Sequence, residues 1–227
     1  MHHAYNGQQA LEVLEKQPIH LVLLDIMMPL MDGMEALTRI RETRSMLVIL
    51  VSAKGESNDK IDGLLGGADD YITKPFHAKE LVARVKSQLR RYMQFQQYDP
   101  LQEENGVLLR QGTLVMNCRE KTVEVDGAPK ALTPLEFSIL QLLMKRPGHV
   151  FSSEKIYQAV WQEDSLGAVA TVAVHIRHIR EKIEINPREP RYLKVIWGRG
   201  YKIEPQQDPQ VTPTSGAEKQ NEKGGNR

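Results

Sequence analysis

The chain has 227 residues, of which 41% are hydrophobic and 26% charged, and its formal net charge is +1. This length fits one or two domains, and the composition is close to that of an average soluble globular protein. The longest apolar runs, such as Met46–Val51, are far shorter than the roughly 20 residues of a transmembrane helix, so no membrane span is expected. No secretory signal is visible, and the single Cys118 allows no internal disulfide, so a cytoplasmic protein is expected.

Charge is unevenly distributed along the chain. Residues 1–95 contain 12 basic and 12 acidic side chains, whereas residues 175–202 contain 8 basic and 3 acidic ones. The basic block is either a solvated helix face or a surface that contacts nucleic acid.

The first half of the chain alternates between two kinds of hydrophobic pattern. Short apolar runs at residues 21–24, 47–51 and 71–73 are typical of strands buried in a parallel sheet. Helical spacing of apolar residues occurs at four places, namely residues 10–14, 37–40, 61–65 and 81–89. This alternation predicts a doubly wound α/β domain.

A polar residue lies at the end of each predicted strand. These residues are Asp25, Ser52 and Lys74. Since sites in open α/β sheets form outside the carboxyl ends of the strands, we expect the three side chains to converge on one crevice.

Two stretches of this half carry a family resemblance. Residues 25–33 (DIMMPLMDG) resemble the phosphorylation loop of bacterial response-regulator receiver domains, and residues 67–76 (GADDYITKPF) resemble their fifth-strand motif. The resemblance implies a flavodoxin-like fold in which Asp25 is the phosphoacceptor. It also implies a switch hydroxyl at Ser52, an aromatic switch at Tyr71, a phosphate-neutralising Lys74 and a cis peptide bond before Pro75.

The same resemblance implies a Mg²⁺ cofactor. A carboxylate that attacks a phosphoryl group brings two anions together, and a divalent cation offsets their repulsion. The family binds Mg²⁺ through an acidic pair after its first strand, the phosphoacceptor and a backbone carbonyl, here those of Asp25 and Met27. The acidic pair is absent from this chain, so we expect an incomplete metal site and poor phosphorylation.

The first strand and first helix of the receiver fold are expected to be missing. The chain opens on His2-His3-Ala4-Tyr5, which matches the end of the second strand. The missing strand is the central one, and its loss leaves an unpaired edge on the strand that ends at Asp25. A start assigned too late, a truncated gene product and a strand supplied by a partner chain are the three explanations.

The second half predicts a winged helix-turn-helix. Short strands are expected at residues 114–116 and 122–125, before an Asp126-Gly127 turn. Thr133, Pro134 and Glu136 form the sequence pattern of a helix start with a capping box. A shorter helix follows, capped by Ser152 or Ser153.

The third helix of this half is the one that predicts a function. Its buried stripe is expected to consist of Val169, Val172, Ile176, Ile179 and Ile183. The opposite side then exposes a largely basic face made of Thr171, Val174, His175, Arg177, His178, Arg180 and Lys182, which suits the major groove of DNA. His175 and His178 are spaced to share a metal ion, but no third ligand is apparent, so no metal site is expected there.

Three stretches resemble the OmpR/PhoB class of response regulators, in particular the vancomycin-resistance branch. They are the hairpin after this helix at residues 192–202, LTPLEF at residues 132–137 and VHIR at residues 174–177. We expect Arg177 and His178 to contact base edges and Arg180, Thr171 and Tyr201 to contact phosphates. Arg199 would enter the minor groove. Trp197 is expected to pack within the hairpin. Ala170 stands where many members carry arginine.

The predicted organisation is a receiver domain at residues 1–93, a linker at 94–106, a winged helix at 107–204 and a disordered tail at 205–227. The resemblance implies a two-component transcription factor that a sensor histidine kinase phosphorylates and that binds promoter DNA and recruits RNA polymerase. It also implies a homodimer in which Lys60 pairs with Glu80, Asp70 with Arg84 and Asp69 with Arg91; bonding within one chain is the alternative for any single pair.

Two other functions are weighed against this one. The first is a fragment that binds DNA without phosphate control, or not at all. The second is an aspartyl-phosphate phosphatase, which needs a second carboxylate two residues after its nucleophile. Met27 occupies that position, so an enzyme is not expected.

Overall fold

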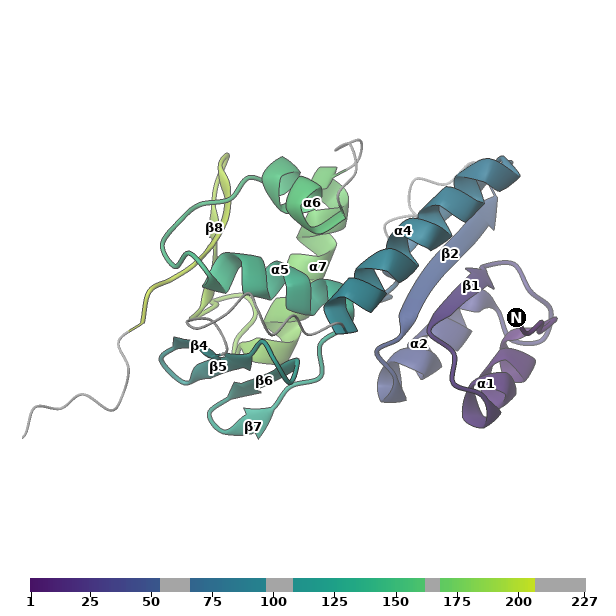
Figure 1. The fold of residues 1–227 in the computed structure, drawn as a ribbon, viewed down its shortest axis with the longest axis horizontal. Helices are drawn as coiled ribbons and strands as arrows, with labels where there is room; N and C mark the ends of the chain where they lie inside the picture. Colours follow the sequence, from purple (N-terminus) through teal and green to yellow (C-terminus); the bar gives the residue numbers. More distant parts are fainter. Residues whose placement is uncertain (54–65, 97–107, 162–167, 207–227) are drawn as a thin grey trace, which may run out of the picture.

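The computed structural model describes residues 1–53, 66–96, 108–161 and 168–206 (Figure 1). The predicted helix at 61–65, most of the predicted linker and the tail from 207 onward lie outside these ranges. Among the helices in the described ranges, none is long and apolar enough to cross a membrane.

The first half folds as the predicted α/β domain. Its elements in chain order are α1 (Gly7–Lys16), β1 (Leu21–Asp25), α2 (Gly33–Thr43), β2 (Leu47–Ala53), β3 (Asp70–Lys74) and α4 (Ala78–Gln96). The strands form a parallel sheet in the order β1-β2-β3. Helix α4 lies across the sheet from α1 and α2 (Figure 1).

Strand β1 is an edge of this sheet in the described part of the chain, as expected, whereas residues 1–4 form no strand. The core is built mainly between the sheet and helices α1 and α2. Leu37 and Ile40 of α2 pack with Val48 and Leu50 of β2, and all four are buried. Helix α4 continues to Gln96, three residues past the predicted domain boundary.

The second half is a winged helix-turn-helix. Its elements are β4 (Leu108–Gln111), β5 (Leu114–Asn117), β6 (Thr122–Val125), β7 (Ala128–Pro129), α5 (Pro134–Met144), α6 (Ser153–Trp161), α7 (Ala168–Ile183), β8 (Leu193–Ile196) and β9 (Gly200–Ile203). Strands β4–β7 form an antiparallel sheet, and β8 and β9 form the hairpin. Short strands β4 and β7 were not predicted.

Helix α5 begins with the predicted capping box. The Thr133 hydroxyl accepts a hydrogen bond from the Glu136 backbone N–H, and the Glu136 carboxylate accepts one from the Thr133 N–H. The second helix is capped by Ser152, whose Oγ accepts from the Lys155 N–H. These caps satisfy backbone donors that the first helical turn leaves unpaired.

The two halves are in contact. Helix α4 contacts both α5 and α6, and it lies between the receiver sheet and the winged helix (Figure 1). A cleft of about 560 Å³ separates the end of α2 and the Gly66-Gly67 turn from residues of α5 and α7. One side of α7 therefore faces the receiver domain.

Candidate functional site

Asp25 lies at the carboxyl end of β1, where the sequence predicts a convergence of polar side chains. The Lys74 ammonium, at the end of β3, donates to Asp25 Oδ2. The other carboxylate oxygen accepts a hydrogen bond of 3.2 Å from the Met27 N–H. Asp25 and Lys74 are both partly exposed, so a substrate can reach the carboxylate.

The start of α2 fixes the loop after Asp25. Asp32 caps this helix by accepting from the Glu35 N–H at 2.8 Å, and the Gly33 N–H donates to Ile26 O at 2.9 Å. A Cβ at Gly33 would lie 2.2 Å from the Asp25 carbonyl oxygen. Only glycine allows the helix to approach the strand end this closely.

Ser52 and Tyr71 lie on the predicted strands β2 and β3, but both are buried, whereas Asp25 is partly exposed. Parallel pairing sets Asp25 opposite Val51, so Ser52 follows on the neighbouring strand. Its hydroxyl donates to Ala53 O at 3.3 Å and is buried. Tyr71 is buried on β3. The Lys74–Pro75 peptide bond is cis, as the resemblance implied.

The Mg²⁺ donor set is only partly present. Receiver domains generally bind Mg²⁺, which prefers six oxygen ligands in octahedral geometry. Of the ligands that the resemblance assigns within this chain, the described residues supply the Asp25 carboxylate and the Met27 backbone carbonyl. Lys74 already contacts one of the two Asp25 oxygens. The Asp25 carboxylate and the Met27 carbonyl alone do not form a complete Mg²⁺ site.

The predicted dimer residues are held by bonds within one chain. Arg84 lies 3.4 Å from Asp70 and 3.5 Å from Glu80. Pairing of these residues across a two-fold axis stays a prediction. Lys60 and the side chain of Arg91 lie outside the described residues.

Asp69 does not lie on an exposed dimer face. Its side chain is fully buried, and its Oδ2 accepts from Arg41 Nη2 at 2.7 Å and from the Val48 N–H at 2.8 Å. Burial raises the pKa of Asp69 to about 6, although Arg41 opposes this shift. In this conformation Arg41 of α2 supplies the cation for Asp69, and the pairing of Asp69 with Arg91 of a partner chain stays a prediction.

The predicted DNA-reading face of α7 is largely buried. The exposed fractions of Thr171, His175 and His178 are 8%, 2% and 8%, and Val174 is also buried. Receiver residues lie close to this face, since Arg41 and the Asp69 backbone both influence the pKa of His175. The expectation that these residues are exposed is therefore wrong for this conformation.

The predicted apolar stripe of α7 is buried except at its first residue. Val172, Ile176, Ile179 and Ile183 are buried as predicted, whereas Val169 is 60% exposed because it lies in the first turn of α7. Periodicity alone does not show where the partner surface of a helix ends.

The remaining basic residues are arranged around α7 and the hairpin. Arg177 is exposed and pairs with Glu181 at 2.7 Å, while Arg180 Nε donates to Leu193 O at 2.9 Å. Burial lowers the pKa of Arg180 and raises that of Tyr201. Arg199 is exposed in the β8–β9 turn.

Trp197 is 88% exposed in the same turn. The expectation that it packs within the hairpin is wrong, since β8 ends at Ile196 and the indole lies beyond the last strand pair. The turn therefore presents an aromatic and a basic side chain to solvent.

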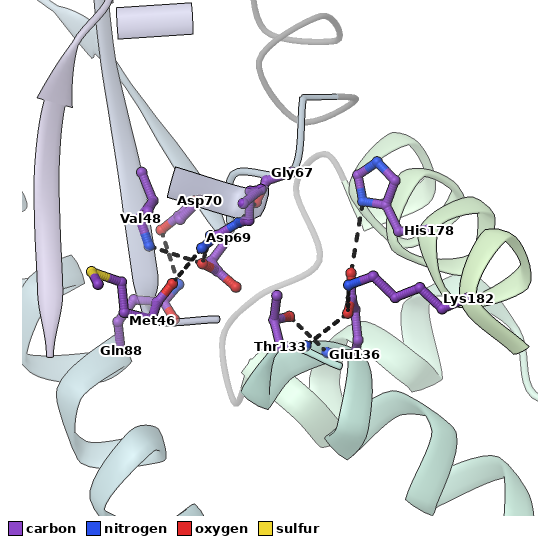
Figure 2. A network of polar contacts seen from close by, with 11 residues as sticks. Met46, Val48, Gly67, Asp69, Asp70, Gln88, Thr133, Glu136, His178 and Lys182 are labelled. Carbon is purple, nitrogen blue, oxygen red and sulfur yellow. Dashed lines mark hydrogen bonds and ion pairs between the residues drawn. The ribbon is translucent and has the colours of Figure 1, made fainter. Parts of the chain in front are cut away.

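Figure 2 shows two networks of polar contacts that the sequence analysis did not predict. In the receiver, Asp69 bonds to the Val48 N–H of β2 and to Arg41. In the winged helix, Glu136 bonds to Lys182 at 2.6 Å and lies 3.9 Å from His178. These partners are 21 to 46 residues apart, and no local pattern connects them.

Comparison with known families agrees with this architecture. Residues 1–86 match the family described as "Response regulator receiver domain", and residues 127–203 match "Transcriptional regulatory protein, C terminal". A receiver domain joined to a DNA-binding domain defines a response regulator that controls transcription, with a sensor kinase and promoter DNA as the implied partners.

Similar proteins define the class more closely. The regulatory protein VanRc of Enterococcus gallinarum is 43% identical over 202 residues, which cover 88% of this chain and 86% of that protein. The transcriptional regulatory protein ResD of Bacillus subtilis (strain 168) is 37% identical, with 88% and 84% covered. A solved structure of a RitR mutant has a TM-score of 0.69 at 23% identity, covering 89% of this chain and 86% of that one, and so shares the fold. The chain belongs to the OmpR/PhoB family of two-component response regulators.

Proposed function

We propose that Asp25 accepts a phosphoryl group from a sensor histidine kinase and that this modification controls DNA binding. The supporting observation is the contact between the Lys74 ammonium and the Asp25 carboxylate, at the carboxyl ends of β3 and β1. In the reaction, a carboxylate oxygen bonds to phosphorus while the bond from phosphorus to the kinase histidine nitrogen breaks. The Lys74 charge offsets the repulsion between the two anions.

Intact-mass measurement after incubation with acetyl phosphate and Mg²⁺ tests this proposal. We expect one phosphoryl group to be added to only a small fraction of the parent chain, because its Mg²⁺ ligands are incomplete, none on Asp25→Asn and a still slower reaction on Lys74→Ala. Lys79→Ala is the matched control, since Lys79 is an exposed lysine at the start of α4. Equal phosphorylation of Asp25→Asn and the parent would contradict the assignment of Asp25.

DNA binding is assigned to α7 and the β8–β9 hairpin. Arg177 is exposed on α7, and Trp197 and Arg199 are exposed in the hairpin turn. A basic helix suits the major groove, and an arginine on the hairpin suits the adjacent minor groove. Thr171, His175 and His178 join this surface once the receiver no longer covers them, while Arg180 and Tyr201 hold phosphates. Such a protein works in the cytoplasm, where bacterial promoters lie.

Phosphorylation is proposed to act through the contact between the domains. The buried face of α7 cannot enter a DNA groove while the receiver lies against it. A phosphorylated receiver would dimerise through the exposed part of α4 and β3, using Asp70, Glu80 and Arg84 together with Lys60 and Arg91. Two winged helices would then bind a direct DNA repeat and recruit RNA polymerase.

Fluorescence anisotropy tests the DNA assignment. The probes are a duplex that the chain itself selects from a random library and a scrambled duplex of the same composition. We expect Arg177→Ala to reduce the discrimination between them by about 1–3 kcal/mol, as for loss of a base contact. Arg199→Ala should weaken binding, and Arg39→Ala, which removes an exposed arginine of α2, should have no effect.

Acetyl phosphate separates the proposal from its alternative. Tighter DNA binding by the treated parent, but not by treated Asp25→Asn, supports phosphate control. Identical binding with and without treatment would favour a protein that binds DNA independently of phosphorylation.

A further inference from the structure

Three buried side chains of the winged helix converge beside the receiver domain. Glu136 projects from α5, and His175 and His178 project from α7. One carboxylate oxygen and one ring nitrogen from each histidine all lie within 4.8 Å of one another. His178 Nδ1 is 3.9 Å from Glu136 Oε1, and Figure 2 shows the two side chains pointing toward each other.

The environment of His175 is unusual for a structural histidine. Its side chain is 2% exposed, and among the described residues neither ring nitrogen has a hydrogen-bond partner of normal geometry. A buried polar group without a partner destabilises the fold.

The charges around the cluster are two carboxylates, Glu136 and Asp69, and the two cations that pair with them, Lys182 and Arg41. Lys182 and the Thr133 N–H bind Glu136 Oε2, and the second oxygen, Oε1, lies toward His178. Asp69, across the domain boundary, is close enough for Glu136 to raise its pKa, and its Oδ1 has no hydrogen-bond partner among the described residues. Glu136 Oε1 thus faces His178 Nδ1 at 3.9 Å, and Asp69 Oδ1 lies outside the Arg41 ion pair.

We propose that Glu136, His175 and His178 bind a divalent transition metal ion, with Zn²⁺ as the best match. Two imidazoles and one carboxylate are a common protein ligand set for zinc, which leaves a fourth position for water. Tetrahedral ligands at zinc distances lie about 3.3 Å apart, so the side chains need to move inward by only about 1–2 Å. The cleft between the domains is lined by Glu136 and His178 and provides an entry path.

Metal binding would oppose DNA binding, and this part of the inference rests on the proposed function. His175 and His178 belong to the predicted DNA-reading face of α7. A zinc ion that ties both histidines to α5 keeps them from the DNA and stabilises the arrangement in which the receiver covers them. The regulator would then respond to metal as well as to phosphate.

Titration of the full chain with Co²⁺ and Zn²⁺ tests the metal site. All variants carry His2→Ala and His3→Ala, so that these two exposed neighbouring histidines do not compete for the metal. In this background we expect one Zn²⁺ per chain by competition with a chromophoric chelator, and visible absorption typical of tetrahedral Co²⁺. His178→Ala and Glu136→Gln should each weaken Zn²⁺ binding by at least about tenfold.

The control variants separate the proposed site from other metal binding. His149→Ala removes a histidine that packs against Phe151 and should bind Zn²⁺ as the background does. Glutamine at 136 still accepts from the Thr133 N–H, so this variant keeps the helix cap, and far-UV circular dichroism checks its fold. No stoichiometric Zn²⁺ binding, unchanged affinity in both ligand variants, or a thiolate-to-cobalt band from Cys118 would each overturn the proposal.

A DNA titration distinguishes the site from its consequence. Zn²⁺ should weaken DNA binding by the background chain and leave Glu136→Gln unaffected, since Glu136 is not among the predicted DNA contacts. Zn²⁺ binding at the three ligands without any change in DNA binding would refute the coupling and the DNA role of the two histidines, while the metal site would stand.

Discussion

Removal of the Arg41 side chain should destabilise the receiver domain more than any nearby exposed arginine. Arg41 donates three hydrogen bonds of 2.7 Å each, to Gly67 O, Met46 O and Asp69 Oδ2. These bonds tie α2 to the ends of β2 and β3. Arg41→Ala leaves a fully buried carboxylate without its cation, which typically costs about 3–5 kcal/mol.

Arg39→Ala is the matched control for this substitution. Arg39 lies on the same helix, two residues earlier, and pairs with Glu35 at 2.7 Å with both side chains about half exposed. Exposed pairs at this helical spacing contribute about 0.3–0.5 kcal/mol. The two arginine variants should therefore differ by about 3 kcal/mol or more in the free energy of unfolding.

The cost of Arg41→Ala should also depend on pH. The pKa of Asp69 is about 6 with Arg41 present, and it rises further once this cation is removed. Ionising Asp69 therefore costs the variant more free energy than it costs the parent. The loss of unfolding free energy caused by Arg41→Ala is larger at pH 8 than at pH 5, by about 1.4 kcal/mol for each further unit by which the Asp69 pKa rises. Adding Asp69→Asn to Arg41→Ala should restore stability at pH 8.

Urea denaturation followed by circular dichroism gives these free energies, and peptide-level hydrogen exchange assigns the transition to α2 and the sheet. Equal unfolding free energies for Arg41→Ala and Arg39→Ala at pH 8 would refute the reasoning. So would a deficit that is the same at pH 5 and pH 8.

Three further variants test other parts of the structure. Asp69→Asn should flatten the pH dependence of the unfolding free energy, which urea titrations at several pH values measure. Because the pKa of Asp69 is raised to about 6, the stabilisation by its protonated form is complete below about pH 4 and is lost as pH rises through 6. The parent should therefore lose roughly 3 kcal/mol over this range. Thr133→Ala should lower the melting stability of the winged helix by about 1 kcal/mol through loss of the helix cap, and an unchanged midpoint would argue against the cap. Gly200→Ala should destabilise the hairpin by more than the roughly 1–2 kcal/mol expected for Gly198→Ala. Both glycines have positive φ, but only at Gly200 would a Cβ lie 2.0 Å from a backbone oxygen, that of Phe151. Similar proteolysis rates for the two variants would contradict this.

Sequence patterns predicted the parts of the structure that local chemistry determines. The capping box of α5 follows from three neighbouring residues, Thr133, Pro134 and Glu136, and it forms as predicted. The meeting of Asp25 and Lys74 follows from parallel strand order, which sets strand ends side by side. Both predictions needed only spacing rules and a sheet topology.

The failures concern surfaces that a distant part of the chain covers. The polar face of α7 resembles a solvated helix face in sequence, yet His175 and His178 are buried, and His175 packs against Trp161 of α6 and lies near Arg41 and Asp69 of the receiver. Asp69 resembles an exposed loop carboxylate, yet Arg41 of α2 holds it in the interior. No helical periodicity indicates which face of one domain contacts another.

Under the proposed function, coverage of α7 by the receiver would set a threshold for DNA binding. If DNA binds only chains in which the domains have separated, the apparent dissociation constant equals the intrinsic one divided by the separated fraction. If one chain in a hundred is separated, DNA affinity falls a hundredfold, which corresponds to about 2.8 kcal/mol. Substitutions at the boundary, far from any nucleotide, would then tune promoter occupancy over two orders of magnitude without altering a single DNA contact.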